Sequence, residues 1–177
     1  MKRLFFLSIV LLITFSCNTT KVFYENGKLK EKGKIIENKK NGKWKYYYKT
    51  GQLKMDSEYL DDIPNGKWVF YYENGEIKEI GYYAKDNWTT FMGRMRTNGT
   101  KNPEEHYLNK NGLWKKYYEN GQLKNIGKYT EKGLQIGEWK YFSENGKLKE
   151  YRLYEQKGVG TVPSSIKRYD ANGNLKE

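Results

Sequence analysis

The sequence predicts an all-β fold in which a repeat array of antiparallel β-hairpins forms an elongated twisted sheet. Asn-Gly or Thr-Gly pairs recur at spacings of 24, 24, 24, 22, 25 and 27 residues, and aromatic residues recur with them. Aliphatic residues are scarce, because only about one residue in six of 17–177 is Leu, Ile, Val or Phe. The 17 Tyr and 5 Trp can bury area in their place, which predicts stacked hairpins without a broad aliphatic core.

The amino terminus predicts export. Residues 1–3 are a basic start, and residues 4–15 are an apolar run that suits a signal peptide and is too short to span a bilayer. Residues 14–17, which end in the chain's one cysteine, Cys17, resemble the lipobox of bacterial lipoproteins. The resemblance implies that residues 1–16 are removed, that Cys17 carries lipid, and that 17–22 form a short tether. A plain signal peptide with a free cysteine is the alternative.

Each unit of residues 23–177 is expected to be a hairpin. Asn-Gly between Tyr- and Lys-rich stretches favours a two-residue type I′ turn. That turn would place Tyr72 opposite Ile77, Trp68 opposite Gly81 and Gly66 opposite Tyr83. The positions that define the repeat are the turn glycines and the tryptophans seven residues before them: Gly27, Gly51, Gly75, Gly99, Gly121, Gly146 and Gly173, with Trp44, Trp68, Trp114 and Trp139.

Two further positions of the repeat form a candidate binding face, one aromatic four residues before each turn glycine and one lysine three residues after it. They are Phe23, Tyr47, Tyr71, Tyr117, Phe142 and Tyr169, with Lys30, Lys54, Lys78, Lys124 and Lys149. In the expected register each lysine lies opposite its aromatic residue and covers the ring. These lysines serve either solubility and sheet packing or the binding of anions such as acidic protein, lipid headgroups or glycan phosphates.

Residues 111–114 (Asn-Gly-Leu-Trp) and 117–124 (Tyr-Tyr-Glu-Asn-Gly-Gln-Leu-Lys) resemble the bacterial MORN-repeat-variant family, and so do 65–68 and 71–78. That family is described as a YwqK-type antitoxin component of toxin–antitoxin systems. The resemblance spans residues 23–177 and implies a sheet of hairpins that binds protein without catalysis, with a toxin as one such partner.

The repeat pattern is blurred in two stretches. Segment 86–111 reads either as a degenerate fourth unit or as a binding loop that gives specificity, with Trp88, Phe91, Arg94, Arg96 and His106 as its candidate residues. Residues 156–165 read as a flexible connection. The last unit has Ile166 where the tryptophan is expected, and its polar end would limit edge-to-edge pairing.

Composition excludes several classes of site. One Cys and one His exclude a disulfide framework and a four-ligand Cys/His zinc site, so we expect no metal and no cofactor. Acidic pairs such as Asp61-Asp62 fit turns better than acid–base catalysis. The net charge of +12 would suit nucleic acid, but export makes that partner improbable.

These observations favour a non-enzymatic, lipid-anchored protein of the bacterial cell envelope, on the outer membrane and facing the periplasm. It would be a scaffold that binds a protein partner, with neutralisation of a toxin as the version that the resemblance implies. The alternative is a structural envelope protein that contacts lipid headgroups or glycans through its Lys/Tyr face. The sequence leaves the oligomeric state open.

Overall fold

The computed structural model describes residues 19–84, 110–158 and 160–176. The predicted signal peptide, Cys17 and the turn at Gly99 lie outside the described residues. So do Trp88, Phe91, Arg94, Arg96 and His106 of segment 86–111.

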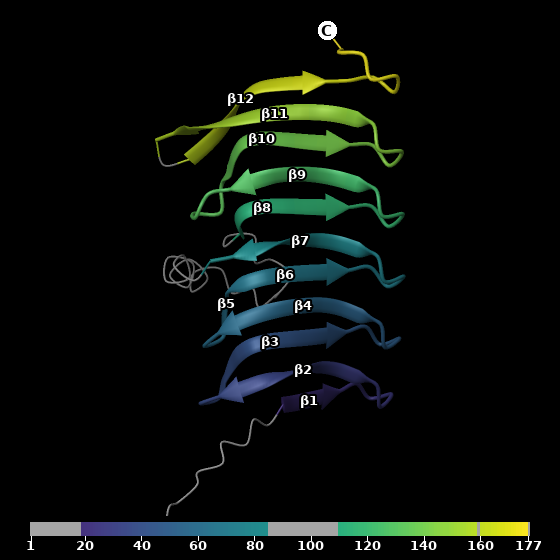
Figure 1. The fold of residues 1–177 in the computed structure, drawn as a ribbon, viewed down its shortest axis with the longest axis vertical. Helices are drawn as coiled ribbons and strands as arrows, with labels where there is room; N and C mark the ends of the chain where they lie inside the picture. The colour runs from purple at the N-terminus through teal and green to yellow at the C-terminus, as the bar shows by residue number, and fades with distance from the viewer. Residues whose placement is uncertain (1–18, 85–109, 159, 177) are drawn as a thin grey trace, which may run out of the picture.

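Twelve strands of the described chain form one open, twisted antiparallel sheet, which confirms the all-β hairpin array (Figure 1). Their order in the sheet follows the chain, except that the short β5 pairs only with β4, beside β6. The strands are β1 (Thr19–Phe23), β2 (Leu29–Ile36), β3 (Lys39–Tyr47), β4 (Leu53–Leu60), β5 (Ile63–Pro64), β6 (Gly66–Tyr71), β7 (Ile77–Tyr83), β8 (Lys110–Tyr117), β9 (Leu123–Tyr129), β10 (Gln135–Phe142), β11 (Leu148–Lys157) and β12 (Gly160–Arg168).

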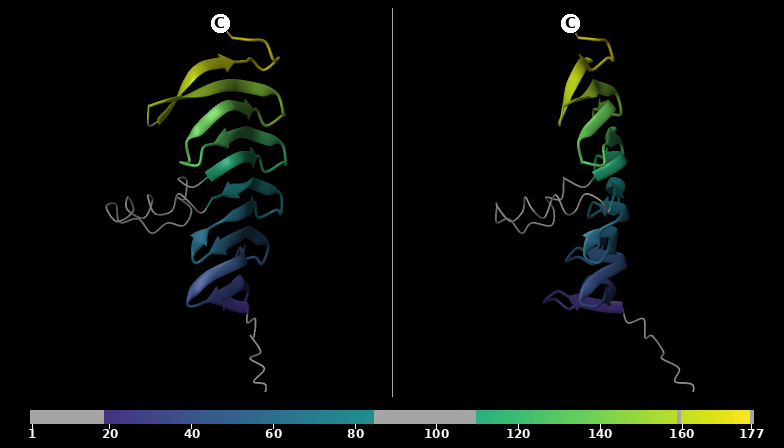
Figure 2. Two further views of the ribbon diagram at one scale, coloured as in Figure 1. Left: turned by 60° about the vertical axis from the view of Figure 1, so that its left-hand side comes forward. Right: turned by 90° about the vertical axis from the view of Figure 1, so that its left-hand side faces the viewer.

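The sheet is elongated because each strand adds one row to it. The two ends of the array lie far apart, and the strands rotate progressively along it (Figure 2). The Asn-Gly and Thr-Gly turns gather along one edge, at the right of Figure 1, which we call the Asn-Gly edge. No helix within the described ranges is long and apolar enough to cross a membrane.

The predicted turn type at the Asn-Gly edge is wrong. In the third unit the N–H of Gly75 donates to the carbonyl of Tyr72 at 3.0 Å, and the N–H of Tyr72 donates to the carbonyl of Glu76 at 2.8 Å. The loop therefore has three residues, and of its residues only Gly75 has a positive φ, of 92°. This is a type I turn followed by a glycine bulge rather than a type I′ turn. The side chain of Asn74 instead accepts the N–H of Glu76 at 2.9 Å.

The register is confirmed away from the turn and wrong beside it. Trp68 pairs with Gly81 and Gly66 with Tyr83, as expected, but Ile77 pairs with Tyr71 instead of Tyr72. The longer loop shifts the register by one residue, and a β-bulge at Lys78 shifts it back. The same bulge skips Lys30, Lys54, Lys124 and Lys149 in the other units. The repeated lysine is therefore the extra residue of a bulge.

Type I′ turns occur instead at the opposite edge. Glu37-Asn38 and Asp61-Asp62 each join two strands through two residues with positive φ. The acidic pair at 61–62 is thus part of a turn, as the sequence indicated.

Each of the four tryptophans in the described ranges packs on the preceding hairpin. A Cβ built on Gly81 would lie 2.1 Å from the ring of Trp114, and one on Gly127 would lie 2.1 Å from the ring of Trp139. The indole N–H of Trp114 donates to the carbonyl of Tyr82 at 3.1 Å. We expected the ring over Gly81 to be its pairing partner Trp68, but the ring comes from the next unit along the chain. The ring of the next unit therefore occupies the space that a side chain at these glycines would fill, and this contact joins one unit to the next.

β7 pairs directly with β8, although residues 84–109 separate them in the chain. Tyr83 and Lys110 are paired across β7 and β8 at the repeat positions that Tyr59 and Pro64 occupy beside the turn at 61–62. A degenerate fourth hairpin therefore does not lie between the third and fifth units of the sheet.

Two predicted boundaries also move. β1 begins at Thr19, within the expected tether, and pairs with β2. Residues 160–165, expected to belong to a flexible connection, are part of β12 and pair with β11. The turn at Gly173 closes only the isolated bridge between Tyr169 and Leu175.

We predict that Gly127→Ala destabilises the array by about 1–3 kcal/mol, because the added methyl group overlaps the ring of Trp139. Urea unfolding followed by tryptophan fluorescence measures the loss. Gly160→Ala is the matched control, since no atom lies within 4 Å of its Cβ position. Equal effects of the two substitutions would contradict the packing argument.

We also predict that segment 85–108 can be replaced by Asp-Asp with retention of the sheet. The register beside Tyr83 and Lys110 is the one that a two-residue Asp-Asp turn joins at Tyr59 and Pro64. Circular dichroism and the urea midpoint should stay within the range of the unaltered chain. Loss of β structure would show that the β7–β8 pairing depends on the segment.

Candidate functional site

A continuous column of alternating Trp and Tyr rings runs along one face of the sheet, which we call the spine face. Neighbouring ring centroids lie 4.8–6.4 Å apart, with interplanar angles of 61–88°. Edge-to-face contacts of this kind add about 0.5–1.5 kcal/mol each beyond the burial of area. The column consists of Trp44, Tyr59, Trp68, Tyr83, Trp114, Tyr129 and Trp139.

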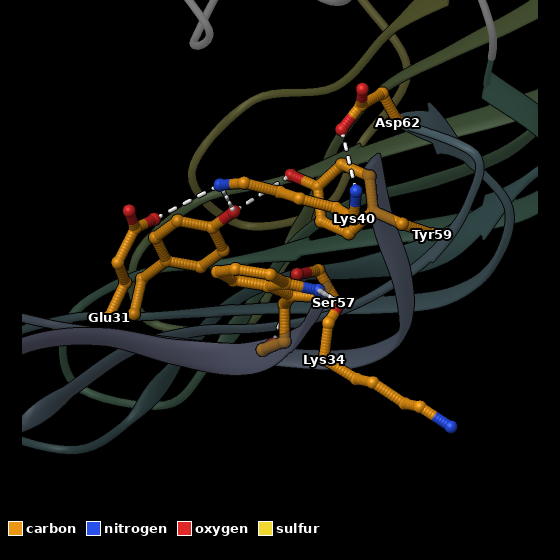
Figure 3. A network of polar contacts seen from close by, with 8 residues as sticks. Glu31, Lys34, Lys40, Ser57, Tyr59 and Asp62 are labelled. Atoms are coloured by element: carbon orange, nitrogen blue, oxygen red, sulfur yellow. Dashed lines mark hydrogen bonds and ion pairs between the residues drawn. The ribbon is translucent and has the colours of Figure 1, made fainter. Parts of the chain in front are cut away.

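A lysine lies inside this column in the second unit (Figure 3). The Nζ of Lys40 lies 4.2 Å from the ring centre of Trp44 and 4.9 Å from that of Tyr46. It donates to Glu31 at 3.0 Å and to the hydroxyl of Tyr46 at 2.7 Å. Burial raises the pKa of Tyr46 to about 12, and it also raises the pKa of Tyr59. Both hydroxyls therefore stay protonated at neutral pH.

An equivalent lysine lies at the β7–β8 junction. Lys110 is only 3% exposed, and its Nζ lies 4.1 Å from the ring centre of Trp114 and donates to Glu79. Lys116 is a second partner of Glu79, at 3.7 Å. Burial lowers the pKa of Lys110, and the carboxylate of Glu79 opposes that shift. This ion pair thus joins the strands on either side of segment 85–109.

The lysine–glutamate pair is absent from the third and sixth units. Met55 and Pro64 take its two positions in the third unit, and Asn125 and Gln135 take them in the sixth. Our reading of the sequence missed both pairs. A signal was available, because Lys-Asn-Gly-x-Trp occurs at 40–44 and at 110–114, each time with a glutamate four residues after the preceding described turn glycine.

The structure does not bring the predicted binding residues together as one face. Tyr47, Tyr71, Tyr117 and Phe142 pair with the Leu or Ile after the turn, on the face opposite the column. The repeated lysines lie at the Asn-Gly edge, and in four of the units the ammonium lies near the tyrosine three residues before the glycine, not four. Ammonium-to-ring-centre distances are 5.9 Å for Lys30 and Tyr24, 5.8 Å for Lys54 and Tyr48, 5.7 Å for Lys78 and Tyr72, and 5.1 Å for Lys124 and Tyr118.

The same tyrosines link successive units. The hydroxyl of Tyr48 donates to the carbonyl of Tyr71 at 2.7 Å, and that of Tyr72 donates to the carbonyl of Tyr117 at 2.9 Å. Tyr24 and Tyr118 make the equivalent bonds, to Tyr47 and Phe142. These residues therefore have a structural role at the edge. A binding role for the aromatic and lysine positions stays a prediction.

The face opposite the column, which we call the lysine face, has no second layer in the described chain. Its central row runs across the strands, with lysines towards both ends and three apolar side chains in the middle that Lys115 interrupts: Lys21, Lys32, Lys45, Asp56, Val69, Ile80, Lys115, Ile126, Lys140, Tyr151 and Lys167. Tyr82 and Leu113, on the adjacent strands β7 and β8, are 52% and 44% exposed. A depression of about 350 Å³ beside this row is lined by Lys43, Asp56, Ser57, Glu58, Lys67, Val69 and Tyr71.

Neither face gathers groups for metal chemistry. No set of three or more His, Cys, Asp or Glu side chains that could hold a metal ion occurs in residues 19–84, 110–158 or 160–176. Lys40 and Lys110 contact aromatic rings and carboxylates of their own chain.

Comparison with protein families settles what the repeat is. The model of the MORN repeat variant family matches residues 17–35, 40–61, 64–85, 110–131 and 135–156. The chain belongs to the MORN repeat variant family. Each match contains one hairpin with its Asn-Gly or Thr-Gly turn, and residues 86–109 fall between two matches. A search of curated proteins found no match to the chain.

We predict that Lys110→Gln lowers the free energy of unfolding by about 2–3 kcal/mol, because Glu79 is left in a largely buried position with Lys116 alone. The double variant with Glu79→Asn imports the pair found in the sixth unit and should recover more than half of the loss. Urea denaturation of the two single variants and the double variant measures the coupling. Additive losses would contradict the pairing.

Proposed function

We propose that this MORN-repeat protein is a non-enzymatic scaffold of the bacterial envelope, anchored by lipid on Cys17, which binds a protein partner on its lysine face. The proposal rests on one observation: the half-buried Ile80 and Ile126 lie on the same face as the exposed Tyr82 and Leu113, with no covering layer in the described chain. Buried apolar area drives most protein association.

Charge indicates what kind of partner fits. Lys67 pairs with Tyr82 across β6 and β7, and Lys128 pairs with Leu113 across β8 and β9, so ammonium groups flank the apolar strip. An apolar surface with acidic residues around its rim is complementary to this arrangement. The surface of a toxin, as the described role of this family suggests, is the partner that we favour.

A second candidate is contact with lipid headgroups or glycans through the Asn-Gly edge. Lys30, Lys78 and Lys124 are exposed there, and the ammonium of each lies over a tyrosine ring. This edge also carries Glu25, Glu73 and Glu119 in its turns. The acidic residues offset the lysines, so the edge is a weaker anion site than the lysine column alone suggests.

Site-specific crosslinking tests the protein-binding proposal. A photoreactive phenylalanine analogue placed at position 113 or 82 should crosslink to a secreted toxin encoded beside this protein, whereas one at Asn125, on the spine face, should not. Leu113→Glu should abolish both the crosslink from position 82 and protection from the toxin, without a change in circular dichroism. Equal crosslinking from position 125 would contradict the proposed face.

A further inference from the structure

The positive charge of the chain is concentrated at one end of the array. Residues 19–50, which form β1 to β3 and their turns, carry ten lysines and three glutamates, a net charge of +7. Residues 51–177 carry 21 basic and 18 acidic residues, a net charge of only +3. The rest of the chain is thus close to electrically balanced, and the part that forms the first three strands is not.

Pairing of the strands places many of these lysines on one face. Lys21 pairs with Lys32, and Lys32 pairs with Lys45, so three ammonium groups lie side by side across β1, β2 and β3. Lys34 and Lys43 lie two positions along from Lys32 and Lys45, on the same face. We call these five residues, Lys21, Lys32, Lys34, Lys43 and Lys45, the basic patch.

Acidic side chains do not balance the basic patch within its own strands. Glu31 lies on the spine face with Lys40, and Glu25 and Glu37 lie in turns. Among the described residues, Lys45 is the one member of the patch that forms an ion pair, with Asp56 of β4 at 3.2 Å. Like charges directly opposite one another destabilise a sheet, so this row works against folding in the isolated protein. An anionic surface would remove that repulsion.

The position of the patch favours a membrane as that surface. β1 begins at Thr19, and two residues of extended chain reach at most about 7 Å, so a lipid on Cys17 would hold β1 close to the headgroups. This step rests on the proposed lipid anchor. One lipid signal combined with a polybasic patch gives firmer attachment than either alone.

We infer that the basic patch on β1–β3 binds anionic lipid headgroups of the membrane that holds the anchor. Contact at this end leaves the rest of the array to extend away from the bilayer. Tyr82 and Leu113 lie on β7 and β8, which β4 and β6 separate from the strands of the patch. The exposed Tyr82 and Leu113 then remain accessible to a protein partner.

Vesicle binding by a lipid-free form tests the patch separately from the anchor. The protein is residues 17–177 with Cys17→Ser, which retains every strand of the sheet. It should sediment with phosphatidylcholine vesicles that contain phosphatidylglycerol and not with pure phosphatidylcholine vesicles. Binding should weaken as salt is raised from about 50 to 500 mM, because salt screens the attraction between solvent-exposed charges.

Two variants with the same net charge locate the contact. Lys21→Gln, Lys32→Gln and Lys34→Gln together should reduce binding at least about tenfold, given roughly fivefold per lysine near an anionic surface. Lys115→Gln, Lys128→Gln and Lys140→Gln together remove the same charge from β8–β10 of the same face and should reduce it less than about threefold. Circular dichroism checks that both variants are folded.

Three results would overturn the inference. The lipid-free protein could bind neutral vesicles as well as anionic ones, or the two triple variants could lose vesicle binding equally. The third result is that the lipid-free protein binds no vesicles, while the triple variant on β1–β3 loses binding to the toxin. The last result would assign the patch to an acidic protein. Failure of the proposed function is distinguishable, because the crosslink from position 113 is measured without vesicles.

Discussion

The fold depends on the contact between each tryptophan and the hairpin before it. Trp114 covers Gly81 and donates its indole N–H to the next carbonyl, and Trp139 does the same over Gly127. Trp68 lies beside Ser57, which takes the glycine's place and is 1% exposed. A single hairpin does not bury its own tryptophan ring, so each unit needs the preceding hairpin to cover that ring. This is why a chain with few aliphatic residues can fold: its core is a one-dimensional column of rings.

Near-identical units create a second problem, which is the order in which they pack. The buried Lys110 finds its partner Glu79 on β7, whereas the same position on β4 is Met55. If β8 packed against β4, a buried ammonium would face a thioether and the pairing energy would be lost. The ion pair therefore adds little net stability in the correct arrangement but strongly penalises a wrong one. Such a device matters most here, where residues 84–109 separate the two strands in the chain.

The repeat and its outer register could be predicted from sequence, because spacing fixes which residues share a row. Pairs such as Trp68 with Gly81 followed directly from the period. The turn type could not, because Asn-Gly suits a type I′ turn and equally a type I turn with a glycine bulge. The two errors, a longer loop and a bulged lysine, cancelled in the outer pairs. The packing between units could not be predicted either, because periodicity does not say whether the tryptophan ring over Gly81 comes from its own unit or from the next.

The candidate site was harder to predict than the fold, because the same residue types serve both. The tyrosine three residues before the turn glycine recurs as Tyr24, Tyr48, Tyr72 and Tyr118, yet its hydroxyl bonds to the next unit. Residues that differ between units are better guides to binding, and they lie on the lysine face. There the central row changes from Lys45 to Val69, Ile80 and Lys115 while the column behind it keeps its alternation of Trp and Tyr.

This division has a physical basis. The inter-unit contacts that stabilise the sheet lie on the spine face and at the Asn-Gly edge, so side chains on the lysine face contribute less to stability. A face with little structural demand can carry charge at one end and apolar groups in the middle without loss of the fold. The repulsion among Lys21, Lys32 and Lys45 is tolerated for the same reason, because the aromatic column supplies the stability that the basic patch removes. Stability and recognition are therefore separated across the thickness of a single sheet.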